Sequence, residues 1–89
     1  MRTRLESSFN RDLRRIRDPS LLNRVNQKIA EIKAAPNLRS IPGVRRVNAP
    51  SGNHYRIRIG RYRLGVTVDG DVAVIVAFGH RSDIYRRFP

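Results

Sequence analysis

Residues 55–67, YRIRIGRYRLGVT, alternate apolar and basic side chains in a pattern that predicts a β-hairpin. Successive residues of a strand point to opposite faces, and Gly60-Arg61 supplies a two-residue turn with glycine at its first central position. In this register Arg58 lies opposite Arg63. The apolar side chains then share one face: Tyr55, Ile57, Ile59, Tyr62, Leu64 and Val66. The stretch therefore predicts two antiparallel strands with one face packed on a core.

The other face of the predicted hairpin carries Arg56, Arg58 and Arg63, together with Gly65 and Thr67. Like charges directly opposite each other destabilise a sheet, so folding alone gives no reason to pair two arginines. A phosphate chain lying across this face converts the repulsion into affinity. The alternative is a solvated outer face, because edge strands use charge to resist aggregation. The hairpin thus predicts a surface that binds a polyanion, and the alternative interpretation is a solvated face with no ligand.

Composition supports an anionic partner and a single folded domain over residues 1–89. The chain has 89 residues, 19 Lys and Arg against 7 Asp and Glu, and a formal net charge of +12. Only Lys28 and Lys33 among the basic residues are lysine, and arginine binds phosphate through two parallel donors. Hydrophobic residues make up 39% of the chain at clear periodicities, which argues against a disordered basic tail.

Several classes of protein are excluded by what the sequence lacks. There is no cysteine for a disulfide or thiolate metal site, and the two histidines are too far apart to suggest a zinc motif. The first residues, MRTRLESSF, have no apolar signal-peptide core, and no apolar run approaches the roughly 20 residues that cross a bilayer. We therefore expect a soluble cytoplasmic protein without a metal or other cofactor.

The N-terminal part of the chain predicts a short strand and two helices. The strand is expected over residues 2–7, and Ser8 is the expected cap of a helix with one apolar stripe: Phe9, Leu13 and Ile16. A second helix begins at Asp18-Pro19 and runs to Pro36 with apolar residues at helical spacing: Leu22, Val25, Ile29 and Ile32. Such an α-hairpin needs a sheet to cover its apolar stripes. The arginines expected on its solvent side are Arg11, Arg14, Arg15, Arg17 and Arg24.

The rest of the chain predicts a loop, a turn and a further strand. Residues 37–54 contain prolines, glycines and Asn/Ser residues and are expected to form an extended loop anchored by Leu38, Ile41 and Val44. Asp69-Gly70-Asp71 predicts a turn, and residues 72–78 an interior strand. If the connection has three residues, the core face of this strand carries Val72, Val74, Val76 and Phe78. If the turn has two residues, these side chains lie on the opposite face. The predicted class is α+β, with an N-terminal strand and α-hairpin packed on an antiparallel sheet.

The order of these elements, the run YRIRIGRYRL and the ending VAFGHRSDIYRR resemble the RelE/ParE superfamily of toxins from type II toxin-antitoxin systems, with the RelE-like ribonucleases closest. The resemblance covers almost the whole chain and implies a microbial RNase fold. It also implies a metal-independent endoribonuclease that enters the ribosomal A site and cuts the messenger there, with the RNA 2′-hydroxyl as nucleophile. Translation stops unless a cognate antitoxin binds the toxin, so the implied partners are antitoxin, ribosome and messenger RNA.

The resemblance also implies which residues carry the chemistry. The family's two basic residues on the first hairpin strand correspond to Arg56 and Arg58, and its arginine on the next strand corresponds to Arg63. The family's arginine just after the last strand corresponds to Arg81, and its C-terminal catalytic tyrosine corresponds to Tyr85. Cleavage needs a base, cations at the phosphate and an acid. Arg63 and Arg81 suit the phosphate clamp. Arginines expected to extend the RNA-binding surface are Arg45, Arg46, Arg61 and Arg86.

The proton-transfer group remains open between two residues. Many relatives have lysine where this chain has Arg56 and Arg58, and arginine stays charged and cannot act as a base. Tyr85 is the better candidate, with stacking on an RNA base as a second role, and His80 is the alternative because histidine titrates near neutral pH.

Each of these roles has a structural alternative. In the structural alternative for Tyr85, the residue anchors the C-terminal segment on the core together with Ile84 and Phe88. In that for Arg81, the side chain forms a surface ion pair with Asp83 or Asp12. At the level of function, the alternatives are a ParE-like inhibitor of DNA gyrase that cuts no RNA, and a catalytically inactive RNA-binding module.

Overall fold

Five strands form one sheet in the part of the chain that this computed structural model describes, residues 1–50 and 52–89. The order across the sheet is β1 (Arg2–Leu5), β5 (Val72–His80), β4 (Tyr62–Asp69), β3 (His54–Ile59) and β2 (Val44–Val47). Strand β1 runs parallel to β5, and the other neighbours are antiparallel. The predicted α+β class is confirmed, with β1 added to the sheet as a parallel edge strand.

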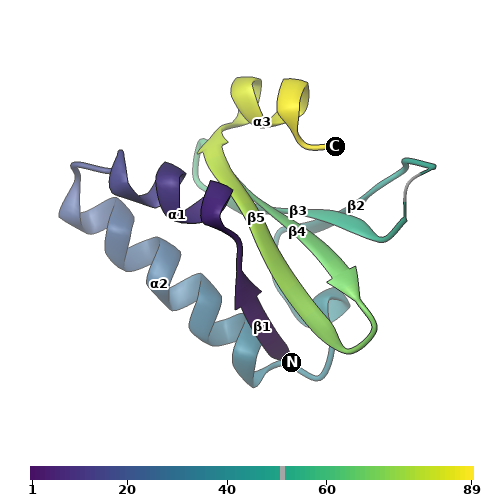
Figure 1. Cartoon of the computed structure of the whole chain (residues 1–89). Helices are drawn as coiled ribbons and strands as arrows, with labels where there is room; N and C mark the ends of the chain where they lie inside the picture. Colours follow the sequence, from purple (N-terminus) through teal and green to yellow (C-terminus); the bar gives the residue numbers. More distant parts are fainter. Residues whose placement is uncertain (51) are drawn as a thin grey trace.

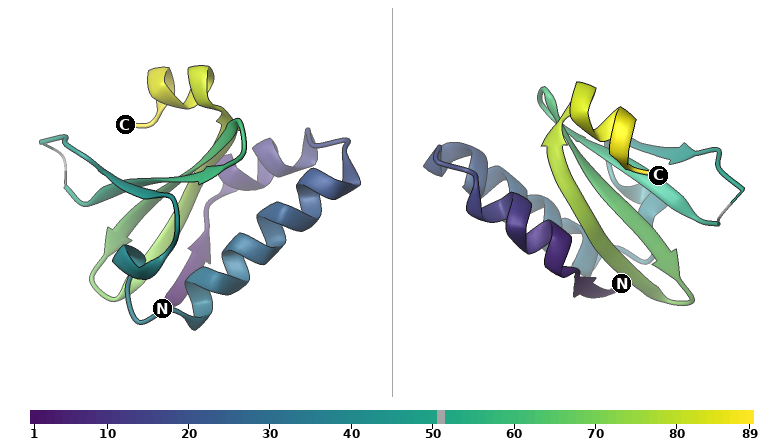
Figure 2. Two further views of the ribbon diagram at one scale, coloured as in Figure 1. Left: turned by 180° about the vertical axis from the view of Figure 1, so that it is seen from behind. Right: turned by 45° about the horizontal axis from the view of Figure 1, so that its top comes forward.

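The helices lie on both faces of this sheet (Figures 1 and 2). Helices α1 (Ser7–Arg14) and α2 (Pro19–Ala34) form the predicted α-hairpin and cover one face. Helix α3 (Arg81–Arg87) follows β5 directly and packs on the opposite face. The sheet is therefore buried on both sides at the end where β5 leads into α3.

The hairpin register is the one that the alternation predicts. Ile59 pairs with Tyr62 and Arg58 with Arg63 across β3 and β4, and Gly60 has a φ of 59° in the turn between them. All six apolar residues of the predicted face contribute to the main core. Tyr55 and Tyr62 are partly buried and pack against this core. The other four are buried within it: Ile57, Ile59, Leu64 and Val66.

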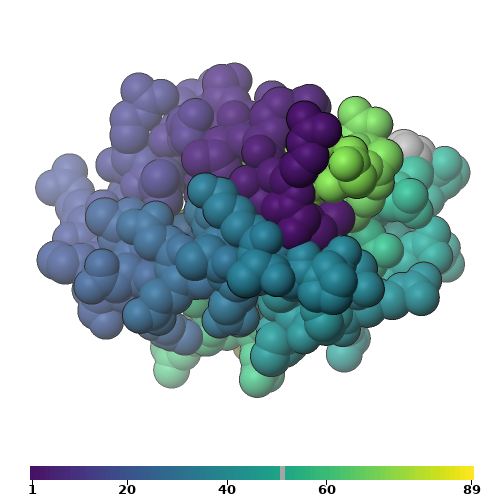
Figure 3. Space-filling view, turned by 90° about the horizontal axis from the view of Figure 1, so that it is seen from below, coloured from purple at the N-terminus to yellow at the C-terminus, as the bar shows by residue number. Residues whose placement is uncertain are grey.

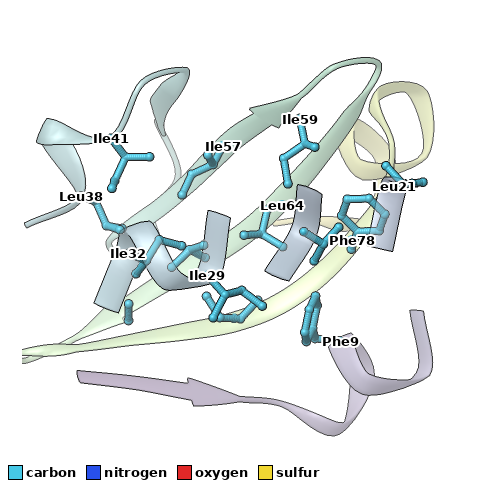
Figure 4. Packing of buried hydrophobic residues seen from close by; sticks show 14 residues of the cluster. Phe9, Leu21, Ile29, Ile32, Leu38, Ile41, Ile57, Ile59, Leu64 and Phe78 are labelled. Carbon is cyan, nitrogen blue, oxygen red and sulfur yellow. The ribbon is translucent and has the colours of Figure 1, made fainter. Parts of the chain in front are cut away.

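Helix α2 supplies the most regular part of the core. Asp18 caps it by accepting a hydrogen bond from the Ser20 N–H at 2.9 Å, and Pro19 occupies the first turn, as predicted. The buried stripe consists of Leu21, Val25, Ile29 and Ile32, so Leu21 takes the place expected for Leu22, which is only partly buried. Figure 4 shows Ile29 and Ile32 packed among the side chains of the sheet.

Helix α1 begins differently from the prediction. Glu6 is its N-cap residue, without a side-chain cap hydrogen bond, and Ser8 lies inside the first turn. The Ser8 hydroxyl donates instead to the Val76 carbonyl at 2.6 Å, which ties α1 to β5. The expectation that Ser8 caps the helix is wrong because the adjacent sheet offers its hydroxyl an acceptor. Phe9 is fully buried, and Ile16 packs on the core beyond the helix end.

The predicted loop over residues 37–54 is wrong for part of its length. It contains the short helix η1 (Leu38–Ser40) and strand β2, which pairs with β3 so that Val44 faces Ile57 and Arg45 faces Arg56. Leu38 and Ile41 are buried anchors, as predicted, and Val44 packs partly buried. The expected loop includes Ser51, which lies outside the described residues. The sequence Val-Arg-Arg-Val does not alternate, so pairing with β3 rather than local pattern defines β2.

The connection from β4 to β5 is a two-residue turn, since Asp69 pairs with Val72. The faces of β5 are therefore reversed relative to a three-residue connection, and Ala73 and Ile75 enter the core. The expectation that Val72, Val74 and Val76 share the core face of the hairpin is wrong, although Val74 is still buried, at 4% exposure. A β-bulge follows, because Val66 pairs with Ile75 while Gly65 pairs with Ala77, and the extra residue returns Phe78 to the core as expected.

Asp12 joins three elements from a buried position in α1. Its carboxylate accepts the Phe78 N–H of β5 at 2.9 Å and pairs with the Arg87 guanidinium of α3 at 3.1 Å. Arg87 also donates to the Phe78 carbonyl at 2.9 Å. The carboxylate is 9% exposed, so loss of this acceptor leaves a buried backbone donor without its partner.

We expect Asp12→Ala to lower the free energy of unfolding by about 1–3 kcal/mol, the cost of an unsatisfied buried donor. Urea denaturation followed by circular dichroism measures the change. The matched control is Asp71→Ala, which removes a carboxylate 3.9 Å from Arg2 in a pair that is 77% exposed on each side. Equal stability loss in the two variants contradicts the structural role of Asp12.

Candidate functional site

A concave pocket of about 250 Å³ lies on the arginine face of the hairpin. We call it the Tyr85 pocket and define it by its lining residues: Gly43, Val44, Arg45, Arg56, Arg58, Arg63 and Tyr85. The register of β2, β3 and β4 brings the arginines together, because Arg45 faces Arg56 and Arg58 faces Arg63. None of the described lining residues is acidic. The pocket therefore combines four guanidinium groups with one phenol, a donor set suited to phosphate.

Tyr85 is presented to solvent by a helix that other residues anchor. Ile84 and Phe88, on either side of it, are buried against Ala77, whereas Tyr85 is 51% exposed. Its ring lies against the Arg56 guanidinium, with Cζ 4.4 Å from the ring centroid, a cation–π contact. The alternative role for Tyr85, as an anchor of the C-terminal segment, is thus taken by its neighbours. Tyr85 is therefore partly open to solvent and lines the pocket.

Arg56 has a different environment from the other arginines of the pocket. It is partly buried, its Nη2 donates to the Phe88 carbonyl at 3.3 Å, and its buried Nε has no partner among the described residues. One guanidinium face is covered by Tyr85. Arg56 therefore links β3 to the C-terminal segment and orients Tyr85, and it has less free hydrogen-bonding capacity for phosphate than Arg58, which is exposed.

Arg63 is held at the turn of the hairpin. Its Nη1 donates to the carbonyls of Gly60 at 3.0 Å and Tyr62 at 2.9 Å. Within the described residues, its Nε and Nη2 make no hydrogen bond, so part of the guanidinium fork remains available to an anion. The two carbonyl contacts restrict the side chain, which lowers the entropy that binding a phosphate costs.

Five of the residues expected at the site do not line the Tyr85 pocket: Arg46, Arg61, His80, Arg81 and Arg86. Arg46 lies on the other face of β2 and donates to the Asn53 side chain at 3.2 Å. Arg61 and Arg81 meet through their backbones, since the Arg81 N–H donates to the Arg61 carbonyl at 3.0 Å. Both are exposed, as is Arg86. Among the described residues Arg81 forms no ion pair, and Arg87 takes the expected place beside Asp12.

His80 faces away from the Tyr85 pocket. It pairs with Tyr62 across β4 and β5, and Tyr62 belongs to the core face, while Gly79 occupies the arginine face opposite Arg63. The His80 ring contacts Tyr62 edge-on at 5.8 Å between centroids, and Nδ1 accepts from the Ser82 N–H at 3.4 Å as the cap of α3. The structure thus gives His80 a capping position outside the pocket.

Gly65 and Phe88 support the pocket and were not identified as site residues from the sequence. A β-carbon built on Gly65 lies only 2.8 Å from the Phe88 ring, so the ring fits because β4 has no side chain there. Phe88 in turn provides the carbonyl that holds Arg56. A lone glycine inside a strand is typical of such a close approach, and this signal was present in the sequence.

Gly65→Ala is expected to displace Phe88 and with it α3, at a cost of about 1–3 kcal/mol in unfolding free energy, typical of overpacking. Denaturation of the single and double variants with Phe88→Ala measures it. In the Phe88→Ala background the same glycine substitution has room for its methyl group, and we expect a much smaller cost. Equal costs in both backgrounds mean that Phe88 is not the obstacle.

Two features absent from the described residues concern metals and membranes. No group of three or more His, Cys, Asp or Glu side chains in the described part of the chain is arranged to hold a metal ion. No described helix is both long and apolar enough to span a membrane. The charge available at the pocket is that of the arginines.

Comparison with known proteins gives a consistent result. Residues 4–85 match the family described as ParE toxin of type II toxin-antitoxin system, parDE. A segment of 37 residues is 49% identical to Toxin RelE3 of Methanocaldococcus jannaschii, and the match spans 42% of this chain and 42% of that relative.

Solved structures agree with this family match. The chain superposes on a chain of the RelB-RelE antitoxin-toxin complex from Methanococcus jannaschii with a TM-score of 0.78 and 28% identity, over 96% of this chain and 98% of that one. The YoeB dimer from Staphylococcus aureus shares the fold, with a TM-score of 0.74 at 18% identity over 91% and 97% of the two chains.

Proposed function

We propose, from the premise that this chain belongs to the ParE toxin family within the RelE/ParE superfamily, that it is a ribosome-dependent endoribonuclease. Membership makes it a toxin of a type II toxin-antitoxin system. The proposed reaction is cleavage of messenger RNA in the ribosomal A site, which inhibits translation. The observation that carries the proposal is the Tyr85 pocket, where free arginine donors and an exposed phenol meet on one face.

The proposed chemistry is attack of the RNA 2′-hydroxyl on the adjacent phosphate. The 2′-hydroxyl loses its proton as its oxygen bonds to phosphorus, the bond from phosphorus to the 5′-oxygen breaks, and the departing 5′-oxygen takes up a proton, so no net proton is consumed. The products are a 2′,3′-cyclic phosphate and a 5′-hydroxyl. Negative charge on the phosphate oxygens rises on the way to the transition state, so cationic donors already held in position stabilise it.

The residues of the pocket divide these tasks. Arg58 and Arg63 bind the phosphate oxygens, and Arg81, which does not line the pocket, is assigned an accessory contact from the start of α3. Arginine stays protonated, so Tyr85 is the only proton-transfer group among the described lining residues of the pocket. Arg56 orients Tyr85 through the ring contact. His80, which faces the other side of the sheet, is assigned no proton transfer. The reaction needs no metal ion in this scheme, because the arginines supply the positive charge.

A cognate antitoxin is the proposed protein partner, as in the solved RelB-RelE complex to which this chain is similar. With a net charge of +12, the chain favours an acidic, amphipathic antitoxin segment that covers the Tyr85 pocket or displaces Tyr85. The proposed resting state is therefore a hetero-oligomer of toxin and antitoxin.

A second candidate function follows from the family match itself, whose description names ParE. In this alternative the chain inhibits DNA gyrase by binding it and cleaves no RNA. The exposed Tyr85 and the opposed Arg58 and Arg63 then have no chemical task, which is why we favour the ribonuclease.

The deciding experiment incubates the purified chain with a defined messenger, with and without ribosomes that have an empty A site, and maps each cut and its end groups. A ribosome-dependent cut that leaves a 2′,3′-cyclic phosphate supports the proposal. An absence of cleavage together with inhibition of gyrase supercoiling supports the second candidate. Salt-sensitive RNA binding without either activity indicates the inactive RNA-binding module.

A further inference from the structure

A second basic hollow adjoins the Tyr85 pocket. It has a volume of about 320 Å³ and lies between α2 and the β3–β4 turn; we call it the Arg24 pocket. Its charged lining residues are Arg24, Lys28, Glu31 and Arg58. Gly43 and Arg58 line both pockets, so the two hollows meet at these residues. Figure 3 shows α2 in blue beside the following teal segment on one face of the molecule.

The junction between the two pockets is shaped by Gly43. Its φ is 81°, a left-handed conformation that favours glycine, and its carbonyl accepts the Arg58 N–H at 3.1 Å. A β-carbon built there lies 3.3 Å from the Arg58 β-carbon. Because Gly43 has no side chain, this residue places no side-chain atoms between the two pockets.

Arg24, on α2, contributes a positive charge to the Arg24 pocket. Its guanidinium lies against Gly60, where a built β-carbon is 3.0 Å from Nη2 and 3.2 Å from Nη1. Among the described residues neither Arg24 nor Arg58 forms an ion pair. Lys28 differs, because Glu31 holds its Nζ at 3.2 Å. The uncompensated charges of the Arg24 pocket are thus Arg24 and Arg58.

We propose that the Arg24 pocket binds a backbone phosphate of the same RNA strand that enters the Tyr85 pocket. This inference rests on the proposed function. The strand crosses Gly43, Arg58 contacts it at the junction, and Arg24 binds a phosphate beyond the cleaved one. An RNA strand suits the path because it carries regularly spaced charges, and counterion release from each contacted phosphate favours binding. Arg24 is an RNA-binding residue in this proposal and takes no part in bond breaking.

The test measures binding of the full chain to a single-stranded RNA whose ribose groups are all 2′-O-methylated, by fluorescence anisotropy at several salt concentrations. Such a probe cannot be cut, so the readout is independent of cleavage. We expect Arg24→Ala to weaken binding several-fold and to reduce the salt slope by about 0.7, the contribution of one single-strand phosphate. A methylated dinucleotide, too short to reach both pockets, should bind the variant and the unchanged chain equally.

Two further variants make the result specific. Arg11→Ala removes the same charge from an exposed site on α1 that lines neither pocket, and it should leave the salt slope unchanged. Glu31→Gln removes the carboxylate that neutralises Lys28 and should strengthen binding of the long probe.

Three outcomes overturn the proposal. If Arg24→Ala and Arg11→Ala lose RNA affinity equally, the loss is explained by overall charge and not by the Arg24 pocket. Unchanged RNA affinity in Arg24→Ala, with weaker binding of an acidic antitoxin peptide, assigns the pocket to a protein partner. A chain that does not bind the long probe has no such RNA path. Failure of the cleavage assay with a positive binding result, by contrast, rejects the ribonuclease activity and leaves the phosphate site in place.

Discussion

Tyr85→Phe is expected to reduce ribosome-dependent messenger cleavage by about 10²- to 10⁴-fold, the usual contribution of a positioned general acid or base. The substitution removes only the hydroxyl. The ring still packs against Arg56, and Ile84 and Phe88 still anchor α3, so the fold and RNA affinity should stay close to those of the unchanged chain. Single-turnover cleavage on ribosomes with an empty A site, at saturating toxin, measures the rate of the chemical step.

Binding and rate distinguish the roles of Tyr85. A large loss of rate with unchanged affinity supports proton transfer by the hydroxyl. Tyr85→Ala additionally removes the ring that covers Arg56, so it should also weaken binding through the lost stacking. Tyr85→Phe with full activity would falsify the proton-transfer role and leave Tyr85 as a stacking platform. His80→Ala is then the next variant to test, although that residue faces the core side of the sheet.

Arg63→Ala is expected to slow cleavage by about 10²- to 10³-fold, the range seen when one preorganised donor is removed from a site of developing negative charge. The guanidinium is held at the hairpin turn by two carbonyls, so the site loses an oriented donor and not merely a charge. Arg63→Lys keeps the charge but lacks the planar fork, and we expect only partial recovery of rate. The same single-turnover assay measures all variants.

Arg46→Ala is the matched control for this experiment. It removes one arginine from the same sheet, but Arg46 lies on the opposite face and bonds to Asn53. We expect a change in rate of only a few-fold, through long-range electrostatics. A comparable loss in Arg46→Ala and Arg63→Ala would show that net charge, not the geometry of the Tyr85 pocket, determines the activity.

The amino-acid sequence by itself determined the hairpin, the α-hairpin and the charge of the surface. Alternation over residues 55–67 has only one register that buries every apolar side chain, so the opposition of Arg58 and Arg63 follows from local pattern. Helix α2 was similarly defined by its Asp18 cap and apolar spacing. These features depend on neighbours within a few residues or on a single turn, which is why periodicity and turn chemistry were sufficient.

Only the tertiary structure decided which of the basic residues share a pocket. The two-residue turn sets the faces at the start of β5, and the bulge at Val76 exchanges them for the rest of the strand, which places His80 on the core side and Gly79 on the arginine side. Strand β2, which brings Arg45 beside Arg56, exists because β3 offers it a partner. Tyr85 reaches the pocket because Phe88 packs on Gly65, 23 positions earlier in the chain. Such contacts join segments that are distant in the sequence, and no local pattern specifies them.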